Sequence, residues 1–324
     1  MNTPNRVVKI ASKINQLYRY LILVSIAVGG FFPQFGPFLK PLVPYLTAVM
    51  VATLTMTCDK EDLLRIVREP SSIGLGLVLI FVLTPFLSYL ISFFFLRPYS
   101  EIAAGLMLVA SAPCAWAVGI WAGLAGGEVM LALTLSVTSA ALSSVLIPFL
   151  MALLAGAYVS LDVFGMLKDL ALMVIVPMIL AAIIKSKVVK ETKEANPLFF
   201  ATSSVIAMIL GATVAAVVLP LLWSQGTEIS LVSLIVATAI QGVLSFALGY
   251  TIPYFVFKRD LRRSITLTYA TGSRNNAFAM AIALSFFPVL SALPSIIYLI
   301  LQVIVSSLML RKFEKMRTPT TRIV

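Results

Sequence analysis

The chain has 324 residues, of which 60% are hydrophobic and only 11% are charged, and its net charge is +11. About a quarter of the residues of an average soluble protein are charged, so a soluble fold could not cover this much apolar surface. The absence of histidine excludes Ser-His hydrolases and HExxH zinc enzymes. The two cysteines, Cys58 and Cys114, imply no disulfide framework. We therefore expect an all-α polytopic membrane protein that is not an enzyme and holds no metal and no bound cofactor.

Ten apolar runs are long enough to cross a bilayer as helices, which takes about 20 residues. A polar segment, 1–19, precedes them and a polar tail, 314–324, follows them. The predicted spanning helices are 20–36, 41–58, 73–96, 102–126, 128–156, 163–185, 198–223, 229–257, 265–287 and 294–313.

Lysine and arginine are distributed unequally over the predicted loops. All but four of the 24 basic residues lie at the two chain ends or in loops on one side of the membrane. The exceptions are Lys40 and Arg97 on the other side, and Lys168 and Arg274 within helices. Because cytoplasmic loops carry an excess of basic residues, this predicts a multi-pass protein of the cell membrane with both termini in the cytoplasm. The surplus charge then needs no nucleic-acid partner.

The ten helices divide into two repeats of five, at 20–156 and 163–313. An odd number of helices in each repeat predicts that the second is inverted relative to the first. The fourth helix of each repeat is interrupted, by Pro113 and Gly119 in the first and by Gly272 in the second. Interrupted helices at corresponding positions point to a transporter's binding site, so we expect the site at helices 4 and 9.

Helix 9 carries a polar cluster in the middle of its apolar run. An arginine at that depth costs at least about 2.5–3.5 kcal/mol and needs a partner or a wet cavity. We expect a substrate site formed by Arg274, Asn275, Asn276 and Ser273. The alternative is structural: Arg274 snorkels or pairs with a helix C-terminus.

Other intramembrane groups extend the candidate site. Cys114 and Trp116 follow the helix-breaking proline, and Gln241 is the largest polar side chain of helix 8. We include all three as substrate-binding candidates. The alternatives are that the proline only kinks the helix for packing and that the cysteine is a small buried hydrophobe.

At these two helices the sequence resembles the bile acid:sodium symporter family. Ala112-Pro113 with the run 124–133 is similar to the family's helix 4–5 pattern, and Ala270–Asn275 is similar to its Glu-x-Gly-x-Gln-Asn stretch. The resemblance implies ten helices with an inverted five-plus-five repeat and broken helices 4 and 9 that cross in the core. It also implies secondary active transport.

The departures from the family pattern fall on the sodium ligands. The family's helix 9 glutamate is matched by Ala270 and its glutamine by Arg274, while only Ser136, Thr271 and Asn275 retain ligand character. We interpret Arg274 as a fixed positive charge that replaces a sodium ion. Na⁺ remains an alternative coupling ion.

The sequence thus predicts a secondary active transporter that moves a small organic anion by alternating access. One alternative is a sodium-coupled symporter with unusual ligands. The other is an arsenite-type efflux permease, because Pro113-Cys114 and Asn275-Asn276 are similar to motifs of that family in the same superfamily. A receptor that binds without transport is separated from these only by a flux measurement. The oligomeric state is left open.

Overall fold

A computed structural model describes residues 6–57, 68–156, 158–188, 196–224 and 231–317. The predictions for Cys58, for the loop lysines and arginines within 58–67 and 189–195, and for the tail 318–324 fall outside these residues. Seven helical segments of the described chain are long and apolar enough to cross a membrane, as a multi-pass membrane protein requires. They are Pro33–Met56, Pro70–Phe95, Val129–Ala155, Val163–Lys187, Asn196–Leu221, Leu231–Val256 and Val289–Met316.

The other three predicted spans are bent or divided. Helix α1 (Arg6–Phe31) bends by 75° between Tyr18 and Tyr20. It therefore begins earlier than predicted, but its bend falls where the polar segment 1–19 ends. Predicted helix 4 is divided into α7 (Ser100–Ser111) and α8 (Val118–Ala125). Predicted helix 9 is divided into α14 (Leu261–Gly272) and α15 (Asn276–Phe286). The count of ten complete spans and the inverted repeat stay predictions.

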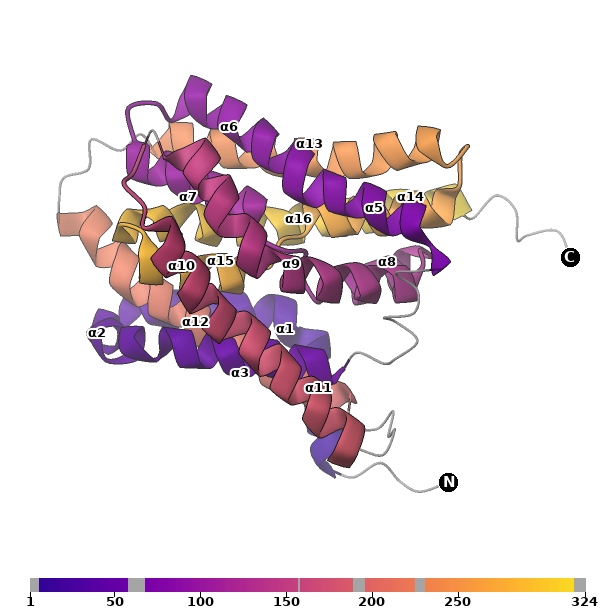
Figure 1. Ribbon diagram of the computed structural model, residues 1–324, viewed down its shortest axis with the longest axis horizontal. Coiled ribbons are helices and arrows are strands. Elements are labelled where there is room, and N and C mark those ends of the chain that lie inside the picture. Colours follow the sequence, from indigo (N-terminus) through magenta and orange to yellow (C-terminus); the bar gives the residue numbers. More distant parts are fainter. Residues whose placement is uncertain (1–5, 58–67, 157, 189–195, 225–230, 318–324) are drawn as a thin grey trace, which may run out of the picture.

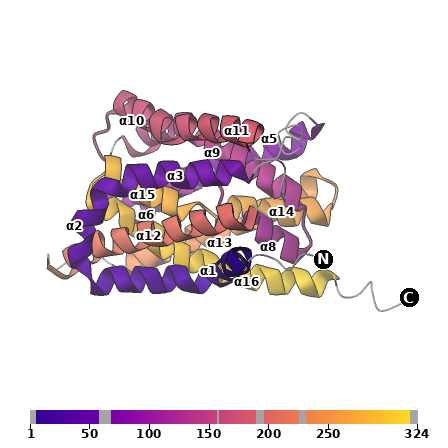
Figure 2. The same ribbon diagram turned by 90° about the horizontal axis from the view of Figure 1, so that it is seen from below.

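The helices pack as two groups. In Figure 1 the group with α1, α3 and α12 lies below the other, and in Figure 2 the two overlap because the molecule is seen from below. In the first, α1 packs against α12, which packs against α3, and α3 packs against α11. We call this set the α12 group. It consists of α1, α3 (Val43–Met56), α10 (Val163–Leu170), the π-helical segment η4 (Ala171–Ile175), α11 (Val176–Val188) and α12 (Asn196–Ser224).

The second set, the crossing group, contains both divided helices. Within it α13 packs against α14, α6 and α16, while α9 packs against α7 and α8. Its members besides α7, α8, α14 and α15 are α5 (Pro70–Val78), the π-helical segment η3 (Leu79–Leu83), α6 (Thr84–Phe95), α9 (Val129–Ala155), α13 (Leu231–Val256), η5 (Val289–Ala292) and α16 (Leu293–Arg317). The last of these extends beyond the predicted boundary at 313, so the first residues of the predicted tail are helical.

The connection between α1 and α3 consists of short helical turns. These are η1 (Pro33–Phe35), α2 (Gly36–Leu39) and η2 (Lys40–Leu42). A proline stands at the first or second position of each turn and again near the start of α3. Because proline supplies no N–H and is tolerated mainly in a first helical turn, the chain restarts repeatedly and reverses direction.

Candidate functional site

The first break, between α7 and α8, is caused by Pro113. A residue before proline is pushed out of the helical region, and Ala112 is extended, with ψ 152°. Helix α8 starts at Val118 and ends at Ala125. Its C-cap, Gly126, has a φ of 86°, the left-handed conformation that glycine adopts without strain. The break thus exposes the carbonyl end of α7 and the amino end of α8 inside the protein.

The second break, between α14 and α15, is short and polar. Helix α14 ends at Gly272, and Ser273 is extended, with ψ 109°. Asn275 is the N-cap of α15, where its Oδ1 accepts a hydrogen bond of 3.1 Å from the Phe278 N–H. An asparagine cap satisfies one of the free N–H groups of a helix start.

The two breaks pair with each other through their backbones. Cys114 and Arg274 form an isolated antiparallel bridge. The Ala115 N–H donates to the Ser273 carbonyl, and the Asn275 N–H donates to the Pro113 carbonyl, both at 2.9 Å. Irregular backbone at membrane depth needs such partners, because lipid offers none. The predicted meeting of the two interrupted helices is therefore present as a crossing of two extended segments.

The side chain of Arg274 is 1% exposed and turns away from the crossing toward helix carbonyls. Its Nη1 donates to the Ala112 carbonyl at 3.0 Å and to the Ile80 carbonyl at 3.4 Å, and its Nη2 donates to Thr84 Oγ1. It thereby caps the C-terminal end of α7, whose partial negative charge favours a cation.

The Ile80 carbonyl is available because of Pro85. In the π-helical segment η3 the Thr84 N–H donates to the Leu79 carbonyl, five residues earlier. The next donor in that register would be residue 85, and proline has no N–H. The Ile80 carbonyl instead accepts from Thr84 Oγ1, at 3.0 Å, and from the Arg274 guanidinium.

Side chains of helix α16 form hydrogen bonds with the second break. Gln302 Oε1 accepts from the Arg274 N–H at 2.7 Å and from Asn276 Nδ2 at 3.0 Å. The Tyr298 hydroxyl donates to the Gly272 carbonyl at 2.9 Å, and Ser273 Oγ lies 3.4 Å from Ser306 Oγ. The side chains at 273 and 276 therefore contact α16.

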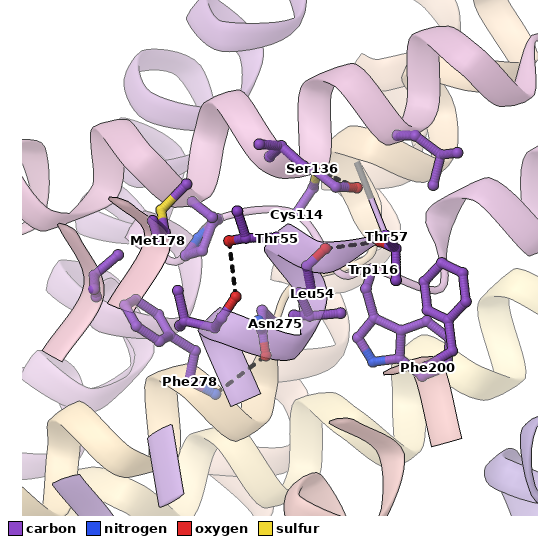
Figure 3. A pocket seen from close by; sticks show the side chains of 16 residues that line it. Leu54, Thr55, Thr57, Cys114, Trp116, Ser136, Met178, Phe200, Asn275 and Phe278 are labelled. Carbon is purple, nitrogen blue, oxygen red and sulfur yellow. Dashed lines mark hydrogen bonds between the residues drawn. The ribbon is translucent and has the colours of Figure 1, made fainter. Parts of the chain in front are cut away.

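A narrow cavity lies beside the crossing, between the two helix groups (Figure 3). Its volume is about 40 Å³, on a scale where one water molecule needs about 10–15 Å³. The α12 group contributes Val51, Leu54, Thr55, Val174, Met178 and Phe200 to its wall, together with Thr57 just beyond α3. The crossing group contributes Pro113, Cys114, Trp116, Leu133, Ser136, Val137, Ala140, Asn275 and Phe278.

The polar atoms of this cavity are neutral. Ser136 Oγ bonds to the Ala115 carbonyl at 3.2 Å and to the Ala132 carbonyl at 2.9 Å, and Cys114 Sγ lies 3.5 Å from Ser136 Oγ. The hydrogen bond that the Asn275 side chain makes within the described residues uses its Oδ1 and leaves its Nδ2 available. That amide is the donor that the cavity offers to a ligand.

The structure separates the predicted site residues into two sets. Cys114, Trp116, Asn275 and Ser136 line the cavity. The remaining substrate and ion candidates lie outside its lining: Arg274, Ser273, Asn276, Gln241 and Thr271.

Two of the outlying candidates and one helix-break candidate have clear packing positions. Gln241 Nε2 donates to the Thr84 carbonyl at 3.2 Å, so it supports the residue that receives the arginine. Thr271 packs against α13, where its Cβ would lie 2.8 Å from a Cβ built at Gly249. Gly119 lies in the first turn of α8, after the break and not in it.

Several residues of the site were not predicted from the sequence. Gln302 was not selected, although an amide in the middle of an apolar helix is the signal that selected Gln241. The contributions of α3 and Phe200 carry no local signal, because they depend on how the two helix groups pack. The π-helical turn before Pro85 was also missed.

The chain is similar to several curated proteins over most of its length. The sequence profile of the sodium bile acid symporter family matches residues 43–222, more than half of the chain. The uncharacterized protein YbaS of Bacillus subtilis is 24% identical over 90% of this chain and 95% of its own length. The uncharacterized sodium-dependent transporter YocS of the same organism is 25% identical over 90% of this chain and 88% of its own.

A plant relative extends the similarity. The probable chloroplastic sodium/metabolite cotransporter BASS5 of Arabidopsis thaliana is 26% identical over 90% of this chain and 74% of its own length. The membrane-spanning helices agree with the transporter family that the profile identifies, and the two divided helices agree with the broken helices that the resemblance to this family implies. The chain belongs to the sodium bile acid symporter family and is a membrane transporter, not an enzyme.

Proposed function

We propose that this protein is a secondary active transporter that moves a small organic anion across the cell membrane by alternating access. The observation that carries the proposal is the cavity beside the crossing, whose wall is shared between the two helix groups. A site between two bodies becomes accessible from one side or the other when one body rocks against the other. In this proposal the α12 group and the crossing group are those two bodies.

The direction of the helices at the crossing favours an anion. Helices α8 and α15 both begin there, and helix N-termini carry partial positive charge. The opposing C-terminal ends are already capped, α7 by the Arg274 guanidinium and α14 by the Tyr298 hydroxyl. Asn275 Nδ2 adds a free donor at the start of α15. An anionic oxygen near this amide would meet donors and no carboxylate.

The size of the cavity bears on the substrate class. About 40 Å³ holds a few water molecules, whereas pockets for drug-sized ligands measure about 300–1,000 Å³. We therefore propose a small substrate and a cavity that widens when the helix groups separate. Ser136, Cys114 and Trp116 would then contact the substrate beside Asn275.

Arg274 is proposed as a resident cation. It is buried at the crossing, and its guanidinium is held by carbonyl and hydroxyl oxygens of the kind that coordinate hard metal ions. A permanent positive charge at this place would make binding independent of an added cation. Ser273, Asn276 and Gln241 position the arginine and its partners in this proposal and do not contact substrate.

Sodium coupling is the second candidate, because two of the relatives are named as sodium-dependent or sodium/metabolite transporters. In that case Na⁺ is the coupling ion. Ser136 and Asn275 could share an ion at the cavity, while Thr271 packs on the α13 side of α14.

The orientation in the membrane follows the charge pattern. The last turn of α11 carries Lys185 and Lys187, and the end of α16 carries Arg311, Lys312 and Lys315. Both helix ends lie toward the right in Figure 1. We propose that this side is cytoplasmic, together with both termini.

Thermal unfolding of the detergent-purified protein against a panel of small organic anions and arsenite tests the function. Each compound is added in sodium and in potassium salts, to wild type and to Arg274→Gln. A ligand that binds only the native state raises the unfolding midpoint. Flux of the same compound into proteoliposomes separates a carrier from a receptor.

The outcomes discriminate among the candidates. Equal stabilisation by an organic anion in both salts, lost in Arg274→Gln, supports the resident cation. Stabilisation by sodium alone, or anion binding that requires sodium, replaces it with sodium coupling. Stabilisation by arsenite alone, lost in Cys114→Ser, favours the efflux permease and contradicts the organic anion.

A further inference from the structure

Trp116 separates two cavities. Its indole lines the narrow cavity beside the crossing and also a wider pocket of about 280 Å³ next to the bend of α1. We call this wider pocket the α1 vestibule. Its other lining residues include Asn15, Gln16, Tyr18, Trp121 and Leu124. Leu124 is 57% exposed, so the vestibule reaches the surface, whereas Trp116 is only 7% exposed.

The indole is held by two rings from the opposite helix group. Its centroid lies 5.3 Å from that of Tyr18, with the ring planes at 59°, and 5.3 Å from that of Phe200, with the planes at 29°. Trp116 belongs to the crossing segment, whereas Tyr18 lies on α1 and Phe200 lies on α12. Aromatic rings at such distances attract each other, in addition to the free energy gained by burying their surface.

The two partner rings sit on one body. Asn15 Nδ2 donates to the Pro197 carbonyl at 3.0 Å, and Ser204 Oγ donates to Asn15 Oδ1 at 3.3 Å. These bonds join the start of α1 to α12 next to Tyr18 and Phe200. A movement of the α12 group would therefore withdraw both rings from the indole together.

We infer that Trp116, held between Tyr18 and Phe200, is the gate that closes the substrate cavity toward the α1 vestibule. The inference rests on the proposed alternating access. In the present conformation the gate is shut. When the α12 group moves away, the indole loses both partners and the cavity joins the vestibule.

Cys114 provides a reporter of the gate. Cys114 precedes Trp116 by two residues in the chain and is 2% exposed. It lines the narrow cavity but not the vestibule. In a Cys58→Ser background it is the remaining thiol, since the chain has two cysteines. The rate at which a charged, membrane-impermeant methanethiosulfonate modifies it, followed by intact mass, reports how often the cavity is open to water.

Trp116→Ala is expected to raise the modification rate about tenfold or more, because two aromatic contacts hold the closed state. The double variant Tyr18→Leu/Phe200→Leu keeps the indole and removes only its partners, and it should raise the rate similarly. Trp121→Ala is the matched control. That indole lines the vestibule but stacks at 6.1 Å on Tyr269 of its own group, so its loss should leave Cys114 protected.

An unchanged rate in the double variant overturns the gate, and so does an equal increase in Trp121→Ala. If Trp116→Ala fails to fold, the double variant decides alone. The assay contains no substrate and no sodium. A failed anion panel with this labelling pattern therefore refutes the proposed substrate and leaves the gate standing.

Discussion

Cys114 and Arg274 are joined by an antiparallel backbone bridge, although 160 residues separate them in the chain. The bridge joins the two interrupted helices at their breaks, where peptide groups would otherwise lack hydrogen-bond partners. Their side chains leave in different directions. The thiol lines the cavity, and the guanidinium enters the carbonyl cluster of Ala112 and Ile80.

Asn275 combines a capping and a proposed binding role that one substitution can separate. Asn275→Asp keeps an oxygen to cap the Phe278 N–H, since both residues are good N-caps, but it removes the Nδ2 donor and adds a negative charge. We expect an unchanged unfolding midpoint and loss of anion transport. Asn275→Ala should lose the cap as well, at about 0.5–2 kcal/mol. Transport of an anion at the wild-type rate by Asn275→Asp would refute the contact.

Removing the buried guanidinium should destabilise the fold strongly. Arg274→Ala leaves the acceptors on Ala112, Ile80 and Thr84 without this donor, and a buried unsatisfied group costs about 1–3 kcal/mol. We expect a clear drop of the unfolding midpoint in detergent. The control is Arg97→Ala, because that arginine is exposed and lies over the Phe93 ring at 5.2 Å. Similar midpoints for the two variants would contradict the capping role.

Gln302 should behave as a structural acceptor. Gln302→Leu removes the oxygen that receives the Arg274 N–H and Asn276 Nδ2, and we expect a loss of about 1–3 kcal/mol in the free energy of unfolding. Gln302→Glu keeps an acceptor at this place and should retain more stability than the leucine variant. Thermal melts of both proteins test the order, and the reverse order would contradict the acceptor role.

Gly272 ends α14 against an aromatic ring. A Cβ at this position would collide with Phe246, so Gly272→Ala should cost about 1–3 kcal/mol through overpacking. Phe246→Leu makes space, and the double variant should recover part of the loss. Additive effects of the two substitutions in a double-mutant cycle would contradict direct contact.

The helices and their two interruptions were largely readable from the sequence. Pro113 and the polar cluster after Gly272 interrupt the apolar runs through their own local chemistry. Such interruptions can be predicted without knowledge of the tertiary structure. The start of α1 was not readable, because residues 6–19 are polar yet helical. Packing against α12 stabilises that helix, and this tertiary contact cannot be predicted from the hydropathy of the sequence.

The orientation of the Arg274 side chain could not be predicted from its position in the sequence. A buried arginine needs acceptors, and the sequence could not reveal that a π-helical turn before Pro85 and an extended Ala112 would supply them. The wall that α3 and Phe200 contribute to the cavity depends likewise on tertiary packing. The crossing was therefore predictable from the sequence, whereas several side chains predicted to bind substrate lie outside the lining of the cavity.

The lining of the narrow cavity has a chemical consequence. Of the residues that form it, only Cys114 can ionise, and a thiol ordinarily does so near pH 8.5. Between about pH 5 and pH 7 the protein wall therefore keeps one charge state. Any change of affinity over that range would belong to the ligand, whose own acid dissociation would decide which of its forms is carried.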